Sequence, residues 1–162
     1  MYEKDLKKFI SKSLIEDIGD GDHTSNACIP DNNFKKAKII IKSNGIIAGI
    51  EMAKMIFYQI DPKIEVNINK NDGENVIYGD TAIKVFGNAK SILKGERLVL
   101  NCMQRMSSIS TKTKHLTELI KDTDVKILDT RKTTPLNRII EKWAVTIGNG
   151  HNHRFGLYDM IM

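Results

Sequence analysis

The sequence predicts a mixed α+β fold, with an irregular N-terminal part followed by the start of a parallel α/β unit. Through residues 1–88, segments with helical spacing alternate irregularly with short β-branched runs. From about residue 105 the order becomes helix, strand, helix, which is typical of a parallel βα unit. One such unit cannot close a barrel or cover a sheet alone, so we expect an incomplete second domain. The predicted domains span residues 1–106 and 107–162.

Hydrophobic periodicity predicts the elements of the first domain. Residues 2–18 place apolar side chains at helical spacing, and Gly19 ends this helix. The remaining elements follow from β-branched content, alternation and turn residues. They are strands at 35–42, 64–69 and 81–86, a helix at 50–60, and a turn at 71–73.

The segment 16–24 is acidic and raises the question of a calcium site, because four carboxylates fall within seven residues. An EF-hand loop needs a bidentate Glu at its twelfth position and a helix after it. Pro30 follows instead, and we interpret the segment as a turn.

The longest helical pattern runs from about Ala89 to Lys121. The hydroxyl-rich run 107–111 weakens it, because short hydroxyl side chains compete for backbone hydrogen bonds. A break is therefore expected, and one kinked helix or two consecutive helices would fit. A short buried strand is predicted at 125–128, and a helix at 137–147 ends at a pair of glycines.

Composition excludes several classes of protein. No run of about 18 apolar residues is present, and the charged N-terminus lacks the apolar core of a secretory signal. We therefore expect a cytoplasmic protein with no membrane partner. Cys28 and Cys102 are expected to be free thiols, the second of them buried in a helix. The net charge of +5 permits nucleic acid, but short basic pairs and 6% aromatic residues predict no such partner.

A first cluster of polar side chains directly follows the predicted strand at 125–128. Arg131 and Lys132 are adjacent cations, and Thr133 and Thr134 supply hydroxyls. Ligand sites of α/β folds gather at the carboxyl ends of strands, where an Arg can grip a carboxylate or phosphate bidentately. The cluster fits an anion site, and a solvent-exposed basic loop is the alternative.

A second cluster, 148–154, brings glycines together with His151, His153 and Arg154. The two histidines suggest a metal, but no third ligand follows, so we favour a second anion-binding loop. From residue 126 to 154 the chain carries six cations against two acids, which is most of its net charge. Charge focused at a few points favours a small anionic ligand.

Five segments together identify a family. They are Glu16–Asp22, Gly95–Asn101, Asp129–Pro135, Glu141–Lys142 and Gly150–Met160. In them the chain closely resembles quinolinate phosphoribosyltransferase, also called carboxylating nicotinate-nucleotide pyrophosphorylase. The resemblance implies an N-terminal open-faced α/β sandwich and a C-terminal irregular α/β barrel. It also implies a homodimer, Mg²⁺ as cofactor, and the conversion of quinolinate and phosphoribosyl pyrophosphate to nicotinate mononucleotide, pyrophosphate and carbon dioxide.

The same resemblance implies roles for individual residues. Arg131, His153 and Arg154 would hold the quinolinate carboxylates, and Arg97 would reach the same substrate from the partner subunit. Lys132 would be catalytic and lie toward phosphoribosyl pyrophosphate. The hydroxyls of Thr133 and Thr134 would assist by hydrogen bonding.

The sequence departs from the family at Leu136 and Asn149, where relatives often carry glycine. The family also continues past Met162 with a further substrate-binding lysine and with groups for the ribose, Mg²⁺ and the 5′-phosphate. We therefore expect the 162-residue chain to bind quinolinate weakly without turnover. Alternatives are a non-catalytic fragment acting through dimerisation, the phosphoribosyltransferase-like paralogue associated with molybdate transport, and a basic nucleic-acid-binding module.

Overall fold

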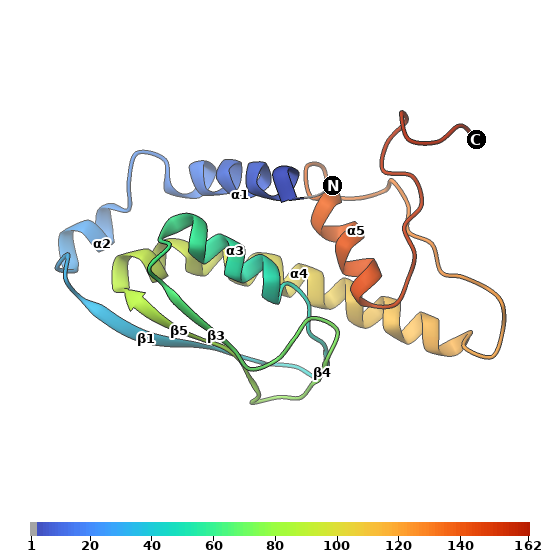
Figure 1. Cartoon of the computed structure of the whole chain (residues 1–162), viewed down its shortest axis with the longest axis horizontal. Helices are drawn as coiled ribbons and strands as arrows, with labels where there is room; N and C mark the ends of the chain where they lie inside the picture. The colour runs from blue at the N-terminus through green and yellow to red at the C-terminus, as the bar shows by residue number, and fades with distance from the viewer. Residues whose placement is uncertain (1–2) are drawn as a thin grey trace.

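The computed structural model describes residues 3–162, and its first part is layered, with helices packed on one face of an antiparallel sheet (Figure 1). Helix α3 lies between α1 and the sheet, and the long α4 packs alongside α3 and continues into the second part (Figure 1). The elements in chain order are α1 (Glu3–Ile18), α2 (His23–Cys28), β1 (Phe34–Ile40), β2 (Gly45–Ile46), α3 (Ile50–Ile60), β3 (Glu65–Ile68), β4 (Asn75–Val76), β5 (Thr81–Asn88), α4 (Ala89–Leu119) and α5 (Arg138–Ile147).

The three-stranded sheet has β5 at its centre, with β1 and β3 antiparallel on either side. Val85 pairs with Ala37 of β1 and Val66 of β3, which sets the register. Ile83 and Val85 are buried on the helix-covered face, whereas Lys84 points to solvent. This alternation confirms the predicted strands and the open-faced sandwich, because one sheet face carries the core and the other does not.

The N-terminal helix uses only part of its predicted apolar face. Leu6 and Ile10 are buried, but Ile15 is 71% exposed. The predicted helix began at residue 2, which lies outside the described residues. The interpretation of 16–24 as a turn was wrong at both ends, because α1 extends to Ile18 and α2 begins at His23. Asp22 accepts a hydrogen bond from Ser25 N (2.9 Å) as the N-cap of α2.

Helix α4 is continuous from Ala89 to Leu119, so the alternative of two consecutive helices separated at 107–111 was wrong. The hydroxyls there bond to other elements instead. Ser107 Oγ accepts from Ala48 N (2.9 Å), and Thr111 Oγ1 accepts from Ile46 N (2.9 Å). Ser110 Oγ donates to Ala144 O of α5 (2.7 Å). The polar run therefore docks α4 onto β2 and α5. Helix α4 also crosses residues 106–107, and the domain boundary there stays a prediction.

The N-terminus of α3 is capped from across a turn. Gly49 adopts a left-handed conformation with a φ of 94°, and a Cβ there would lie 3.1 Å from Met103 Cα. The carboxylate of Asp72 accepts from Ile50 N (2.9 Å) and Glu51 N (3.3 Å). Burial raises the pKa of Asp72 despite these bonds. The loop between β3 and β4 thereby stabilises the start of a core helix.

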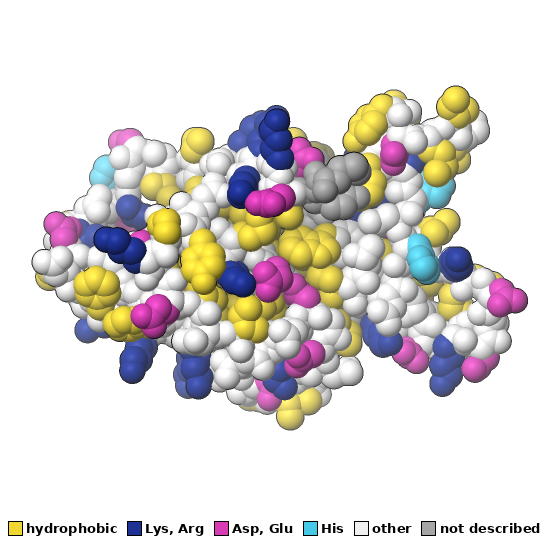
Figure 2. Space-filling model, viewed as in Figure 1, with side chains coloured by type: hydrophobic (Ala, Val, Ile, Leu, Met, Phe, Trp, Pro, Cys, Tyr) yellow, Lys and Arg dark blue, Asp and Glu magenta, His cyan; other side chains and the backbone are white. Residues whose placement is uncertain are grey.

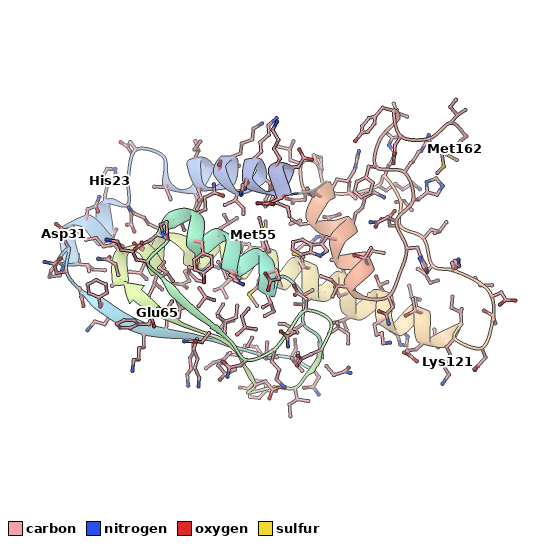
Figure 3. The ribbon with its side chains drawn as sticks, viewed as in Figure 1. His23, Asp31, Met55, Glu65, Lys121 and Met162 are labelled. Carbon is pink, nitrogen blue, oxygen red and sulfur yellow. The ribbon has the colours of Figure 1, made fainter. Side chains whose placement is uncertain are left out.

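In the second part, α5 packs against α4, and the chain then turns back to run alongside α5 toward Met162 (Figure 3). Leu128 forms a parallel bridge with His151, which confirms the predicted parallel pairing. The prediction of a buried strand at 125–128 was wrong, since Val125 is 62% and Leu128 51% exposed. Within residues 3–162 this segment pairs along one edge only, which is too little to bury it.

Exposed apolar side chains gather over the segment after α5, at the upper right of Figure 2. Tyr158, Ile161 and Met162 are the most exposed of them, at 88%, 98% and 85%. Among the described helices, none is both long enough and apolar enough to cross a membrane.

The two cysteines are both free, as predicted, and should differ in reactivity. Cys28 is exposed, whereas Cys102 is 3% exposed and burial raises its pKa to about 12. At pH 8 the Cys102 thiolate fraction is then on the order of 1 in 10,000, and the thiolate is the reactive form.

We expect iodoacetamide to add one group to the native chain and two in urea, measured by mass spectrometry. A Cys28→Ser variant should take up none when native; native modification of Cys102 at the rate of Cys28 would contradict the burial.

Candidate functional site

Two loops leave the same end of the parallel pair formed by residues 127–129 and His151. His151 N donates to Ile127 O (2.9 Å), and Asp129 N donates to His151 O (3.0 Å). The first loop continues as 129–135 and the second as 151–155. Both lie at carboxyl ends of strand-like segments, where ligand sites of α/β folds form. Both predicted anion-binding clusters are therefore brought to one edge of the molecule.

A buried lysine joins the two loops from behind. Lys142 of α5 is fully buried, and its Nζ forms an ion pair with Asp129 Oδ1 at the start of the first loop. The same Nζ donates to His153 O (2.9 Å) in the second loop. Asp129 Oδ1 also accepts from His153 N (2.8 Å). The backbone on both sides of His153 is thus held by one charge pair.

Two further groups surround this ion pair. The Phe155 ring centroid lies 4.7 Å from Lys142 Nζ, which is within cation–π range. With its amide nitrogen turned toward Asp129, Asn152 donates to Asp129 Oδ2 (2.6 Å) and to Lys142 O (3.0 Å). Buried charges are tolerated when paired and hydrogen-bonded in this way.

Arg138, at the first turn of α5, forms a second link between the loops. Its Nη1 donates to Phe155 O (2.7 Å), and its Nε donates to Thr133 Oγ1 (3.2 Å). Its Nη2 lies 3.4 Å from Arg131 O, which it also bonds. One guanidinium therefore connects the first loop at two points to the second loop.

The first loop is also fixed to the long helix. Arg105 of α4 donates from Nε (3.0 Å) and Nη2 (2.8 Å) to Glu141 Oε1, and Glu141 is 6% exposed. Thr134 N donates to Glu141 Oε2 (3.3 Å), and Thr134 Oγ1 accepts from Arg105 Nη2 (3.2 Å). Thr134 therefore serves the scaffold through both its backbone and its hydroxyl.

The predicted site residues fall into two groups. Arg131, His153 and Arg154 are half-buried on the facing loops, and Lys132 is exposed beside them. Among the described residues, Arg131 Nε is buried with no hydrogen-bond partner. An unsatisfied buried donor is unfavourable, and a ligand acceptor would relieve it.

Arg97 belongs to neither loop. It is exposed on α4 and lines a groove of about 800 Å³ between α1, α4 and residues 135–140. Lys8, Lys12, Arg105 and Arg138 also line this groove. The groove also carries four acids, Asp5, Glu16, Asp17 and Asp159, and it reaches Pro135 and Phe155 at the ends of the two loops. The structure therefore places Arg97 in an open groove of mixed charge that borders the paired loops.

Sequence reasoning missed the scaffold of the site. No structural role was predicted for the residues that form it. Arg138 and Lys142 were counted in the net charge, Lys142 and Asn152 lie in segments that carry the family resemblance, and Arg105 was not considered. A signal was present, because residues four apart share one face of a helix, and Arg138 and Lys142 are four apart. Within residues 3–162 no group of three or more His, Cys, Asp and Glu side chains is arranged to hold a metal ion.

Family models cover nearly the whole chain. The model described as the N-terminal domain of quinolinate phosphoribosyl transferase matches residues 22–107, and the model of the C-terminal domain matches residues 109–162.

Curated and solved relatives agree with these models. The chain is 48% identical over 159 residues to quinolinate phosphoribosyltransferase [decarboxylating] 1b of Nicotiana tabacum, covering 98% of the chain and 45% of the relative. It is 43% identical over all 162 residues to a probable nicotinate-nucleotide pyrophosphorylase [carboxylating] of Bacillus subtilis, covering 56% of that protein.

The crystal structure of NadC from Streptococcus pyogenes superposes with a TM-score of 0.93 at 32% identity, covering 99% of the chain and 57% of that structure. The chain thus spans about half the length of the curated relatives it matches. With both family models matched in order, and with this fold, the chain belongs to the quinolinate phosphoribosyltransferase family.

Proposed function

We propose that this chain carries the quinolinate-binding side of a phosphoribosyltransferase of NAD biosynthesis. The complete reaction joins quinolinate to phosphoribosyl pyrophosphate and releases pyrophosphate and carbon dioxide, leaving nicotinate mononucleotide. The chain spans about half of its relatives, so this activity is proposed for the whole protein. The observation that carries the proposal is the buried, unpartnered Nε of Arg131 between two cation-bearing loops.

The chemistry of quinolinate matches this arrangement. Its two adjacent carboxylates need several fixed cations, and a guanidinium can bind a carboxylate through two parallel hydrogen bonds. Leaving a buried donor unpaired costs about 1–3 kcal/mol, so a carboxylate that pairs with Arg131 Nε gains that amount in addition to the charge attraction. His153 and Arg154 on the facing loop are proposed to hold the second carboxylate.

The reaction itself needs mainly position and charge from the protein. The ring nitrogen of quinolinate attacks the anomeric carbon of the ribose as the bond to pyrophosphate breaks. Lys132, exposed beside Arg131, is proposed to stabilise the charge that develops on pyrophosphate. Once alkylated, the ring nitrogen is positive and stabilises the electron pair left on the adjacent ring carbon when the carboxylate of that carbon departs as carbon dioxide. The same carbon then takes up a proton.

Two features of the proposal concern groups outside a single chain. Arg97, exposed and in an open groove, is proposed to reach the substrate of a partner subunit in a homodimer. Mg²⁺ is proposed as the cofactor from the family resemblance alone. The described residues offer no cluster of metal-binding side chains that fits it.

Calorimetric titration of the 162-residue chain with quinolinate tests the proposal. We expect weak binding by the unmodified chain and binding at least about tenfold weaker in Arg131→Ala, the equivalent of losing one charged hydrogen bond. Arg131→Lys should recover little of the lost affinity. An ammonium keeps the charge but cannot donate two parallel hydrogen bonds to one carboxylate.

Lys126→Ala is the matched control, since Lys126 is an exposed cation just before the first loop. Its loss changes the net charge by the same amount and should leave the affinity unchanged. Equal losses in Arg131→Ala and Lys126→Ala would mean that general charge attraction, not a defined site, binds the ligand.

A further inference from the structure

We infer that Arg138 and Lys142 of α5 are positioning residues that hold the two loops at the separation quinolinate requires. This inference rests on the proposed function, because it concerns the spacing of Arg131 from His153 and Arg154. Neither cation is among the proposed substrate-binding residues, and Lys142 is fully buried.

The paired segments begin as an ordinary parallel ladder. His151 N donates to Ile127 O (2.9 Å), and Asp129 N donates to His151 O (3.0 Å). A strand pair would continue with main-chain bonds two residues further along each segment. At that point side chains make the contacts instead.

The first side-chain rung lies between Asp129 and His153. His153 N donates to the Asp129 carboxylate (2.8 Å) rather than to a main-chain carbonyl. His153 O accepts from Lys142 Nζ (2.9 Å), which also pairs with Asp129. The carboxylate and the ammonium therefore replace both main-chain bonds of one ladder step.

The second rung lies two residues further on, between Arg131 and Phe155. The Arg138 guanidinium donates to Phe155 O (2.7 Å) and to Arg131 O (3.4 Å). Arg138 and Lys142 are four residues apart and so lie on one face of α5. Arg138 and Lys142 of α5 therefore keep the two segments aligned beyond the main-chain ladder. Side-chain hydrogen bonds replace the main-chain bonds between the two backbones there.

This construction has a consequence for the ligand. The two loops stay aligned, but side chains separate their backbones. We infer that this leaves space between the loops on the side where Arg131 and Arg154 lie. The spacing is set by groups that face away from the ligand, because Lys142 is enclosed by Asp129 and the Phe155 ring. A ligand that bridges both loops through two carboxylates depends on this spacing, whereas a ligand held by one loop does not.

The test compares two ligands in variants of the chain. Quinolinate carries two carboxylates and nicotinate carries one, so their affinity ratio reports bridging. We expect Arg138→Ala to weaken quinolinate binding by about tenfold or more, the equivalent of losing one hydrogen bond to a charged group. Nicotinate binding should change much less, so the ratio falls by about tenfold. Ile140→Ala is the stability control, because Ile140 is buried on the same helix and makes no side-chain contact of the kind described above.

A ligand-independent measurement separates this inference from the proposed function. In Lys142→Met, hydrogen exchange at His153 N should accelerate beyond what the loss of global stability explains, and in Ile140→Ala it should not. If quinolinate does not bind the unmodified chain, the proposed function fails, and the exchange result still decides whether α5 orders the loops. An unchanged affinity ratio in Arg138→Ala, or unchanged relative exchange at His153 in Lys142→Met, would overturn the inference.

Discussion

Replacing Lys142 with methionine is expected to destabilise the chain by about 3–5 kcal/mol, the cost of removing one partner of a buried ion pair. The Asp129 side chain is 6% exposed, and Lys142 is its only cationic partner within residues 3–162. Methionine fills much of the same volume as lysine, so no large cavity forms. The lost stability comes from the unpaired Asp129 carboxylate and from His153 O, which loses its hydrogen-bond donor. Urea unfolding followed by circular dichroism measures the effect.

A double variant tests whether the charge is the cause. In Lys142→Met with Asp129→Asn, neither member of the pair is charged, and the asparagine oxygen can still accept from His153 N. We expect the double variant to recover a substantial part of the lost stability, because replacing both ions of a buried pair is far less costly than breaking it. Equal urea midpoints for the original chain and Lys142→Met would contradict the structural role of the pair.

Gly148→Ala is the second change with a large expected effect. Gly148 follows α5 with a φ of −79°, a conformation open to any residue, so backbone freedom is not the reason for glycine. An added Cβ would lie 2.5 Å from Ser110 O and 2.7 Å from Thr113 Cβ on α4. Since a helix carbonyl cannot swing away, α5 must shift, and we expect a loss of about 1–3 kcal/mol.

The sign of this effect is informative, because replacing glycine with alanine at an unstrained site usually stabilises by about 0.4–1 kcal/mol through the unfolded state. Gly156→Ala is the matched control. A Cβ at Gly156 would also be crowded, but by the ring of Tyr158, which is 88% exposed and free to rotate away. Thermal unfolding should show a lowered midpoint for Gly148→Ala and little change for Gly156→Ala. A raised midpoint for Gly148→Ala would show that α4 and α5 are not in close contact there.

The hydroxyl-rich run of α4 illustrates where sequence reasoning failed. Sequence-based reasoning treats Ser107, Ser110 and Thr111 as helix-weakening, because it considers only hydrogen bonds to the neighbouring backbone. In the fold, their partners are Ile46, Ala48 and Ala144, between 34 and 65 residues away. The competition that weakens an isolated helix is removed once tertiary partners take the hydroxyls. The exposed segment at 125–128 is the reverse case, since its apolar residues predicted burial that a single pairing edge does not provide.

The sequence by itself determined the main elements, the two loops that carry Arg131, His153 and Arg154, and, through its resemblance, the family and the open-faced sandwich. These follow from short-range periodicity and from motifs that are contiguous in the chain. Only the tertiary structure decided how the loops are held, through Lys142, Arg138 and the buried Asp129. Those bonds join residues 11 to 24 positions apart, and they form because α5 packs back against the paired segments and removes the charges from water. In a low-dielectric interior each charge must find a partner, and packing alone determines which one is within reach.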